Sequence, residues 1–208
     1  MAVEKTPANT IASKTASTPP ALRFTPELLL RAQGPHLGLR CAFFDVDGVL
    51  TDGRVYIGEA GEVFKAFSTL DGQGLKLLLQ AGITPLIITG RDSPAVRKRM
   101  HDLGLAHARY GVVDKLAAAQ DMLTQLGCGW DEAAAMGDDW PDLPLMARAA
   151  LACAPANAHP EAQALAHHVT VALGGHGAAR EFCDLLLLAS GRYAALLQGQ
   201  LRTLDGSP

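Results

Sequence analysis

The sequence has no apolar run long enough to cross a membrane, no excess of basic charge and no pair of closely spaced cysteines. Apolar runs such as residues 185–189 fall far short of the roughly 20 residues that span a bilayer. With 18 basic and 21 acidic residues the net charge is -3, so we expect neither nucleic acid nor a membrane as partner. The four cysteines lie far apart and suggest neither a zinc knuckle nor a disulfide framework. These features predict a soluble, cytoplasmic protein.

The length and composition predict one folded domain. A chain of 208 residues with 49% hydrophobic content can bury one core, but not two ordinary domains with linkers. The first twenty residues are rich in Thr, Ala, Ser and Pro and lack the apolar segment of a signal peptide. Because they contain Glu4 and no Arg, a transit peptide is disfavoured. We expect a disordered leader over residues 1–24, a domain over residues 25–190 and a C-terminal tail over residues 191–208.

From residue 39 onward, short apolar runs alternate with helical segments, which predicts an α/β fold with a doubly wound parallel sheet. The expected strands of the sheet cover residues 39–44, 84–89, 107–110, 132–136, 150–154 and 168–171. The expected helices cover residues 26–33, 74–81, 93–103, 114–126, 141–149, 159–166 and, as the last helix, 177–189. Two further β-rich runs, residues 54–57 and 62–67, predict a hairpin. Ligands of such sheets bind beyond the carboxyl ends of the strands.

Two carboxylates separated by one residue, Asp45 and Asp47, follow the first expected strand and precede Gly48. This pattern suits an aspartyl-phosphate mechanism, which needs an in-line nucleophile and a proton for the leaving alkoxide. Asp45 is the candidate nucleophile. Asp47 is the candidate acid, and afterwards the base that deprotonates the hydrolytic water. The glycine allows the backbone to approach a phosphate closely.

Three more polar side chains are expected at the same edge of the sheet: Thr89, Lys115 and Asp138. The carboxylates of Asp45 and Asp138 and the main-chain carbonyl of Asp47 are hard oxygen donors, which suit octahedral Mg²⁺. Thr89 offers a hydroxyl and Lys115 a positive charge to the phosphoryl oxygens. The sequence therefore predicts a magnesium-dependent phosphoryl-transfer site.

The order of these motifs resembles the haloacid dehalogenase-like superfamily. DVDG at residues 45–48, ITGR at residues 88–91, Lys115 and GDD at residues 137–139 are similar to its four motifs. Members of the superfamily differ in the cap domains that cover the site. The segments between the motifs hold only a hairpin, helices and strands, so no cap fits. Because phosphoryl transfer benefits from exclusion of water, we expect another subunit to close the site.

A narrower resemblance is to the 3-deoxy-D-manno-octulosonate 8-phosphate phosphatases, which are capless tetramers. It rests on further segments, namely DVDGVLTDG (45–53), KAFSTLDGQGLKLL (65–78), GDDWPDLPLM (137–146), AHP (158–160) and GGHGAAREFCDLLLL (174–188). The resemblance implies that the hairpins assemble the tetramer and that the tail can reach a neighbour's active site. It also implies a sugar-acid pocket shared between subunits, formed by Ser68, Thr69, Asp71, Gly72 and Lys76, with Arg91 and Arg99 nearby. Leu70 stands where better-known members have Arg.

Other interpretations remain open at this point. The same mechanism could act on an N-acylneuraminate 9-phosphate, because few residues bear on the sugar. A non-catalytic scaffold is disfavoured, since the complete set of reactive residues is present. Asp52 fits a turn, and Asp142 either supports the metal ligands without binding the ion itself or is a surface charge. Glu62 is expected on the surface of the hairpin.

Overall fold

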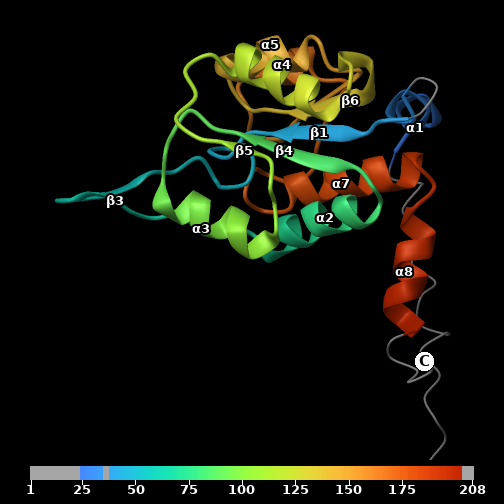
Figure 1. Cartoon of the computed structure of the whole chain (residues 1–208), viewed down its shortest axis with the longest axis horizontal. Helices are drawn as coiled ribbons and strands as arrows, with labels where there is room; N and C mark the ends of the chain where they lie inside the picture. The colour runs from blue at the N-terminus through green and yellow to red at the C-terminus, as the bar shows by residue number, and fades with distance from the viewer. Residues whose placement is uncertain (1–23, 35–37, 203–208) are drawn as a thin grey trace, which may run out of the picture.

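The computed structural model describes residues 24–34 and 38–202. Six parallel strands form the sheet, in the order β5-β4-β1-β6-β7-β8 (Figure 1). They are β1 Cys41–Phe44, β4 Thr84–Ile88, β5 Ala108–Arg109, β6 Ala133–Met136, β7 Leu151–Ala154 and β8 His168–Val169. All six expected strands are present, each shorter than expected, and the doubly wound parallel fold is confirmed.

The chain reverses its direction of winding at β1. This strand pairs with β4 on one side and with β6 on the other, so Phe44 lies level with both Ile87 and Met136. The first crossover leaves β1 toward β4 and β5, whereas β6, β7 and β8 extend the sheet on the opposite side. The crevice beyond the carboxyl end of β1 is therefore the topological switch point, where ligands of such folds bind.

Helices cover both faces of the sheet, and the alternation of side chains along β1 divides the core between them. Ala42 and Phe44 belong to one buried cluster, which includes residues of α2 Thr69–Gln80, α3 Pro94–Leu103 and α7 Ala178–Ala189. Cys41 and Phe43 belong to the other, with residues of α4 Lys115–Leu126, α5 Leu143–Met146 and α6 Pro160–Leu165. Figure 1 shows α4 and α5 on one side of the sheet and α2, α3 and α7 on the other. The inner strands β1, β6 and β7 are buried along their whole length, as the interior of a parallel sheet requires, whereas the edge strands β5 and β8 are partly exposed.

Helix α2 begins at Thr69, so the prediction of a helix starting at residue 74 was wrong. The hydroxyl of Ser68 caps it by accepting from the backbone N–H of Leu70 at 3.2 Å. Gly72 and Gly74 weaken the helical pattern in the sequence because glycine has low helix propensity. Space is short at both positions, since a Cβ on Gly72 would lie 2.3 Å from the guanidinium of Arg99 and one on Gly74 would lie 3.1 Å from Cys183.

The segment after β6 is also more broken than expected. A 3₁₀ turn, Trp140–Asp142, comes before the short helix α5, in place of one helix over residues 141–149. The helix α7 is not the last one, because α8 Tyr193–Arg202 occupies most of the predicted tail. Figure 1 shows α8 leaving the layered body. The leader through residue 23 and residues 203–208 lie outside the described part of the chain.

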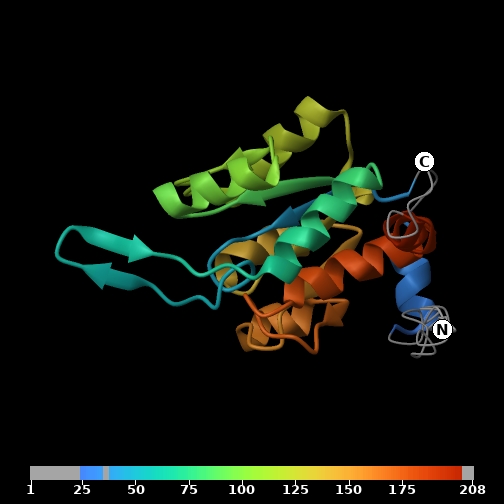
Figure 2. The ribbon, with the colours of Figure 1, turned by 90° about the horizontal axis from the view of Figure 1, so that it is seen from below.

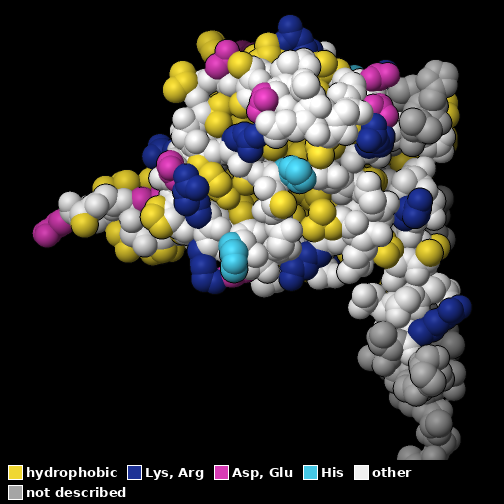
Figure 3. Space-filling view, in the orientation of Figure 1, with side chains coloured by type: hydrophobic (Ala, Val, Ile, Leu, Met, Phe, Trp, Pro, Cys, Tyr) yellow, Lys and Arg dark blue, Asp and Glu magenta, His cyan; other side chains and the backbone are white. Residues whose placement is uncertain are grey.

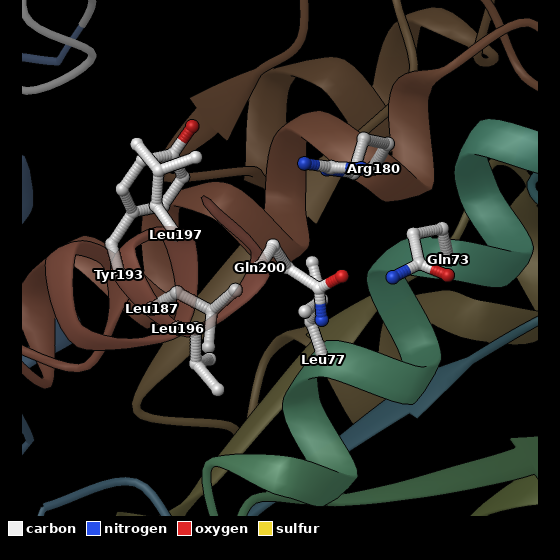
Figure 4. Close-up of a pocket in the computed structure, with 8 residues that line it drawn as sticks. All are labelled: Gln73, Leu77, Arg180, Leu187, Tyr193, Leu196, Leu197 and Gln200. Carbon is white, nitrogen blue, oxygen red and sulfur yellow. The ribbon is translucent and has the colours of Figure 1, made fainter. Parts of the chain in front are cut away.

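A pocket separates α8 from the body of the molecule (Figure 4). Tyr193, Leu196 and Leu197 of α8 line it together with Leu77 of α2 and Leu187 of α7.

The short helix α1 Pro26–Ala32 begins at the predicted cap Thr25, whose hydroxyl accepts from Leu28 N. Over residues 24–34 and 38–202, none of the helices has the length and apolar character of a membrane span.

The predicted hairpin is present as β2 Tyr56–Gly58 and β3 Gly61–Phe64. It projects from the body in two perpendicular views (Figures 1 and 2). Its side chains Ile57, Val63 and Phe64 are exposed, and Figure 3 shows apolar side chains along the projection. No cap domain is present between the motifs in the described residues. The capless fold expected from the spacing is confirmed.

Candidate active site

The loop after β1 presents Asp45 at the switch point. The backbone N–H of Asp45 donates to Met136 O at 3.2 Å and so extends the sheet by one residue. The loop then turns tightly, with Leu50 N donating to Val46 O at 2.9 Å. Gly48 has φ +102°, and a Cβ there would lie 2.0 Å from the Asp138 carboxylate. A side chain at this position would therefore displace the second acidic loop from the first.

Lys115 joins the loops chemically. As the first residue of α4, whose N-cap is Asp114, it reaches back so that its Nζ lies 2.6 Å from Asp45 and 2.7 Å from Asp142. The second oxygen of Asp142 accepts from Asp138 N at 3.2 Å. Lys115, Asp45 and Asp142 are all buried. Asp142 is thus not a surface charge: it fixes both the lysine and the loop that carries Asp138.

The carboxylates of Asp45, Asp138 and Asp142 form one cluster, with ligand oxygens within 4.8 Å of one another. Burial, and next the charge of Asp45, raises the pKa of Asp138 to about 8. Burial and the charge of Asp142 also raise the pKa of Asp45, against the opposing effect of Lys115. One ammonium does not balance three crowded carboxylates, so the donor set fits a divalent cation. A metal site in this acidic cluster is thus consistent with the sequence prediction.

Removal of metal is expected to make stability fall as the pH rises. The pKa of Asp138 is about 8 in the folded chain against an ordinary 3.8, so folding favours its protonated form. That contribution is complete below the ordinary pKa and is lost as the pH rises through the folded one. In chelator, we expect a lower melting temperature at about pH 9 than at about pH 6, and a larger Mg²⁺-induced rise at about pH 9. An equal Mg²⁺-induced rise in melting temperature at both pH values would contradict this. So would an Asp138→Asn variant that keeps the same difference in melting temperature between the two pH values.

The carboxylate of Asp47 is not part of this cluster and has other partners. One carboxylate oxygen pairs with Lys65 Nζ, and the other lies 3.9 Å from Arg91 Nε. Lys65 also pairs with Glu62 at 3.0 Å, and Ser93 Oγ donates to the second oxygen of Glu62. Glu62 lies on the hairpin as predicted, but its side chain is half-buried in an ion-pair network that the sequence did not indicate. Sequence reasoning also missed Lys65, because a single lysine at the end of a β-rich run carries no recognisable spacing.

Thr89 follows β4, next to the loop after β1 that carries Asp45. Because Phe44 pairs with Ile87, Thr89 lies one position beyond the level of Asp45. Its side chain is buried, and its hydroxyl accepts from Arg91 N at 3.3 Å. Asp52 accepts from Arg54 N at 3.0 Å, in agreement with the turn interpretation. The side chains predicted for phosphoryl transfer thus lie in loops, or in the case of Lys115 at a helix start, beyond the carboxyl ends of the strands.

Sequence comparison with known proteins identifies the family. The profile described as haloacid dehalogenase-like hydrolase matches residues 110–181. A protein of Yersinia pestis named 3-deoxy-D-manno-octulosonate 8-phosphate phosphatase is 44% identical over 151 residues, which are 73% of this chain and 81% of that protein. The chain belongs to this phosphatase family. It is therefore a phosphoric monoester hydrolase with a haloacid dehalogenase-like fold, and the predicted resemblance is confirmed.

Two solved structures of the phosphatase family show bound metal. One from Moraxella catarrhalis, in complex with magnesium, phosphate and the KDO molecule, has 35% identity and a TM-score of 0.78, and the match covers 83% of this chain and 97% of that one. The cobalt-bound form from Haemophilus influenzae has 37% identity and a TM-score of 0.73, with 78% and 92% covered. The acidic cluster described above is consistent with metal binding in this chain as well.

The residues predicted for the sugar-acid pocket lie at the start of α2 and along it, in the loop after β4 and on α3. Thr69 and Lys76 are exposed on α2, whereas Arg91 is exposed close to Asp47. Gly72 packs against Arg99, which donates to the carbonyl of Ser68 at 3.1 Å. The structure of one chain thus does not gather these residues around Asp45.

Asp71 has a role within the chain that the sequence did not indicate. Its carboxylate is buried and accepts from the backbone N–H groups of Gly177 at 3.2 Å and Arg180 at 2.8 Å. The N-terminus of α7 has no cap from its own N-cap residue, Gly177. Asp71 therefore supplies the acceptor that α7 lacks, and it holds α2 against α7.

Loss of this cap is expected to affect stability more than catalysis. Asp71→Ala should lower the free energy of unfolding by about 1–2 kcal/mol, whereas Asp71→Asn, which keeps one acceptor, should lower it less. Denaturant unfolding measures the change. The KM of the folded variants should stay unchanged. A raised KM with unchanged stability would instead assign Asp71 to the substrate pocket.

Proposed function

We propose that this chain hydrolyses 3-deoxy-D-manno-octulosonate 8-phosphate to the free sugar acid and phosphate, in the cytoplasm, for lipopolysaccharide biosynthesis. The observation that carries the proposal is the buried contact of Lys115 with Asp45 at the switch point, in a chain 44% identical to a phosphatase of that name. A nucleophilic carboxylate held by an ammonium beside two further carboxylates, Asp138 and Asp142, suits phosphoryl transfer.

The proposed reaction proceeds in two steps. In the first, a carboxylate oxygen of Asp45 attacks phosphorus, the bond to the sugar oxygen breaks, and Asp47 gives that oxygen a proton. In the second, Asp47 takes a proton from a water that attacks the aspartyl-phosphate and frees Asp45 and phosphate. Lys115 and Thr89 stabilise the charge that spreads over the phosphoryl oxygens. Burial of Asp45 and Lys115 strengthens these interactions because little water screens them.

We propose Mg²⁺ as the cofactor, held by the carboxylates of Asp45 and Asp138 and by the main-chain carbonyl of Asp47. Support comes from the all-oxygen donor set and from the magnesium in the Moraxella catarrhalis structure. When bound, the ion neutralises charge on the phosphoryl oxygens. Asp142 adds a third carboxylate to the cluster, but its contacts with Lys115 and with Asp138 N support a role in positioning these groups.

Substrate choice is proposed to depend on a second copy of the chain. The exposed apolar side chains of the hairpin, Ile57, Val63 and Phe64, support an assembly surface. In the proposed homotetramer, the sugar acid contacts Ser68, Thr69 and Lys76 of a neighbour, with Arg91 and Arg99 nearby, while Asp71 and Gly72 support this surface from within α2. We propose a phosphatase domain over residues 25–190 and a tail over residues 191–208 that extends toward a neighbouring site. A monomeric mass in solution with full activity would contradict this arrangement.

A phosphate-release screen tests the proposed substrate. The purified chain with Mg²⁺ is assayed on 3-deoxy-D-manno-octulosonate 8-phosphate, an N-acylneuraminate 9-phosphate, nucleotides and phosphoserine. We expect the highest kcat/KM on the first, no activity in excess chelator, and recovery on addition of Mg²⁺. A higher kcat/KM on any other substrate would overturn the substrate proposal, and full activity in chelator would overturn the metal proposal.

A further inference from the structure

Lys65 is buried where the sequence would place a surface residue. It follows β3 at the base of the projecting hairpin, beside the exposed Val63 and Phe64, yet its side chain has 0% exposure. Removing an ammonium from water costs several kcal/mol unless partners compensate it. The compensating partners are Asp47 and Glu62. The chain therefore keeps a buried ion pair directly on the proposed acid and base.

The contacts of Lys65 restrict Asp47 to one arrangement. The ammonium binds Oδ1 of Asp47, so this oxygen is occupied whether or not the carboxyl carries a proton. Among the described residues Oδ2 has no hydrogen bond, and its ion-pair partner is Arg91, whose Nε lies 3.9 Å away. The two oxygens are thus unequal, and Oδ2 is the one left to exchange a proton with substrate or water.

Lys65 is itself held from the side away from Asp47. Glu62 accepts from the ammonium at 3.0 Å, and the hydroxyl of Ser93, at the start of α3, binds the same carboxylate. The series Ser93, Glu62, Lys65 and Asp47 therefore connects α3 and the hairpin to the nucleophile loop. A long, flexible lysine side chain loses its rotamer freedom in such a network.

Each of the two carboxylates proposed to react is paired with its own buried lysine. Lys115 pairs with Asp45 and Asp142, whereas Lys65 pairs with Asp47 and Glu62. Among the described residues, no ion pair connects one set with the other. The nucleophile and the acid are thus oriented by separate cations.

We propose that Lys65 is a positioning residue that orients Asp47 for proton transfer, an inference that rests on the proposed role of Asp47. In the first step the substrate's P–O bond breaks as the Asp45–P bond forms, and a proton moves from Oδ2 of Asp47 to the leaving oxygen. In the second, a water oxygen bonds to phosphorus, the Asp45–P bond breaks, and a water proton moves to Oδ2. Lys65 keeps Oδ2 directed at these oxygens by holding Oδ1.

The leaving group separates this role from simple anchoring of the hairpin. An alkoxide leaving from a sugar phosphate needs a proton in the transition state, whereas p-nitrophenolate is stable without one. A residue that acts through Asp47 therefore affects the two substrate classes unequally. A residue that only anchors the hairpin affects them alike.

The test compares kcat/KM of Lys65→Met with that of the unmodified chain on 3-deoxy-D-manno-octulosonate 8-phosphate and on p-nitrophenyl phosphate, both with Mg²⁺. We expect a loss of about 10- to 100-fold on the sugar phosphate and less than about threefold on the aryl phosphate. Glu62→Gln, which removes a charge from the network but leaves Lys65 on Asp47, is the matched control and should lose less on the sugar phosphate. Equal losses on both substrates would overturn the proposal.

A double-mutant cycle provides the second readout. If Lys65 acts through Asp47, Lys65→Met should add almost no further loss on the sugar phosphate to Asp47→Asn. An undiminished loss in that background would overturn the proposal. Melting curves check that each variant folds. If Lys65→Met does not fold, the double variant Lys65→Met with Glu62→Leu, which removes both charges, replaces it in both experiments. Absence of turnover on both phosphates in the unmodified chain would instead refute the proposed function.

Discussion

Asp45→Asn is expected to lower kcat by at least about 10⁴-fold, because an amide is a poor nucleophile for phosphorus. The substitution keeps the shape of the side chain and removes its charge. Burial, and next the charge of Asp142, raises the pKa of Asp45, so the site disfavours the ionised form in the absence of metal. The metal-free variant should therefore be at least as stable as the unmodified chain. Phosphate release and thermal unfolding measure the two effects.

Asp52→Asn is the matched control, because it makes the same change seven residues along the chain in the same loop region. Asp52 accepts from Arg54 N, and an asparagine oxygen can keep this bond. Its kcat should stay within about twofold of that of the unmodified chain. Appreciable turnover by a clean preparation of Asp45→Asn, or an equal loss in Asp52→Asn, would refute the nucleophile assignment.

Lys115→Met is expected to impair activity and stability together. Its Nζ neutralises both Asp45 and Asp142, and all three groups are buried. Removing one member of a buried ion pair leaves uncompensated charge and costs about 3–5 kcal/mol. Loss of the positive charge beside the phosphoryl group should also lower kcat by roughly 10³-fold. Denaturant unfolding and phosphate release measure these effects.

The control for Lys115 is Lys98→Met on the surface of α3. Lys98 pairs with Asp102 one helical turn away, and both side chains are largely exposed. Water screens such a pair, so the free energy of unfolding and the turnover should hardly change. A Lys115 variant that behaves like Lys98→Met would show that the buried contacts carry neither stability nor catalysis.

The sheet could be predicted because its signal is local. The inner strands β1, β6 and β7 are short apolar runs that are buried along their whole length. The start of α2 could not be predicted, since Gly72 and Gly74 have low helix propensity and their reason is the approach of Arg99 and Cys183 from distant segments. The last helix was missed for a related cause. In the sequence, α8 follows Gly191, which reads as a stop signal.

The candidate site likewise contains residues that the sequence predicts and residues that it does not. Asp45, Lys115 and Asp138 each follow a strand or begin a helix, so their meeting at one edge follows from the parallel topology. The network of Lys65, Glu62 and Ser93 depends instead on how the hairpin folds back toward α3. Nothing in the spacing of these three residues indicates that contact. The cap that Asp71 provides for α7 likewise joins residues more than one hundred positions apart.

The central claim is that the phosphoryl group passes through Asp45, and trapping of that intermediate tests it most directly. Asp47→Asn is mixed with p-nitrophenyl phosphate and Mg²⁺, because the aryl leaving group needs no acid while hydrolysis of the intermediate lacks its base. The reaction is then quenched with acid, and peptide mapping locates the residue that carries the phosphoryl group. We predict a burst of p-nitrophenol of about one per chain, with the phosphoryl group on the peptide containing Asp45. A burst without a phosphoryl group on Asp45, or a phosphoryl group on another residue, would contradict the mechanism.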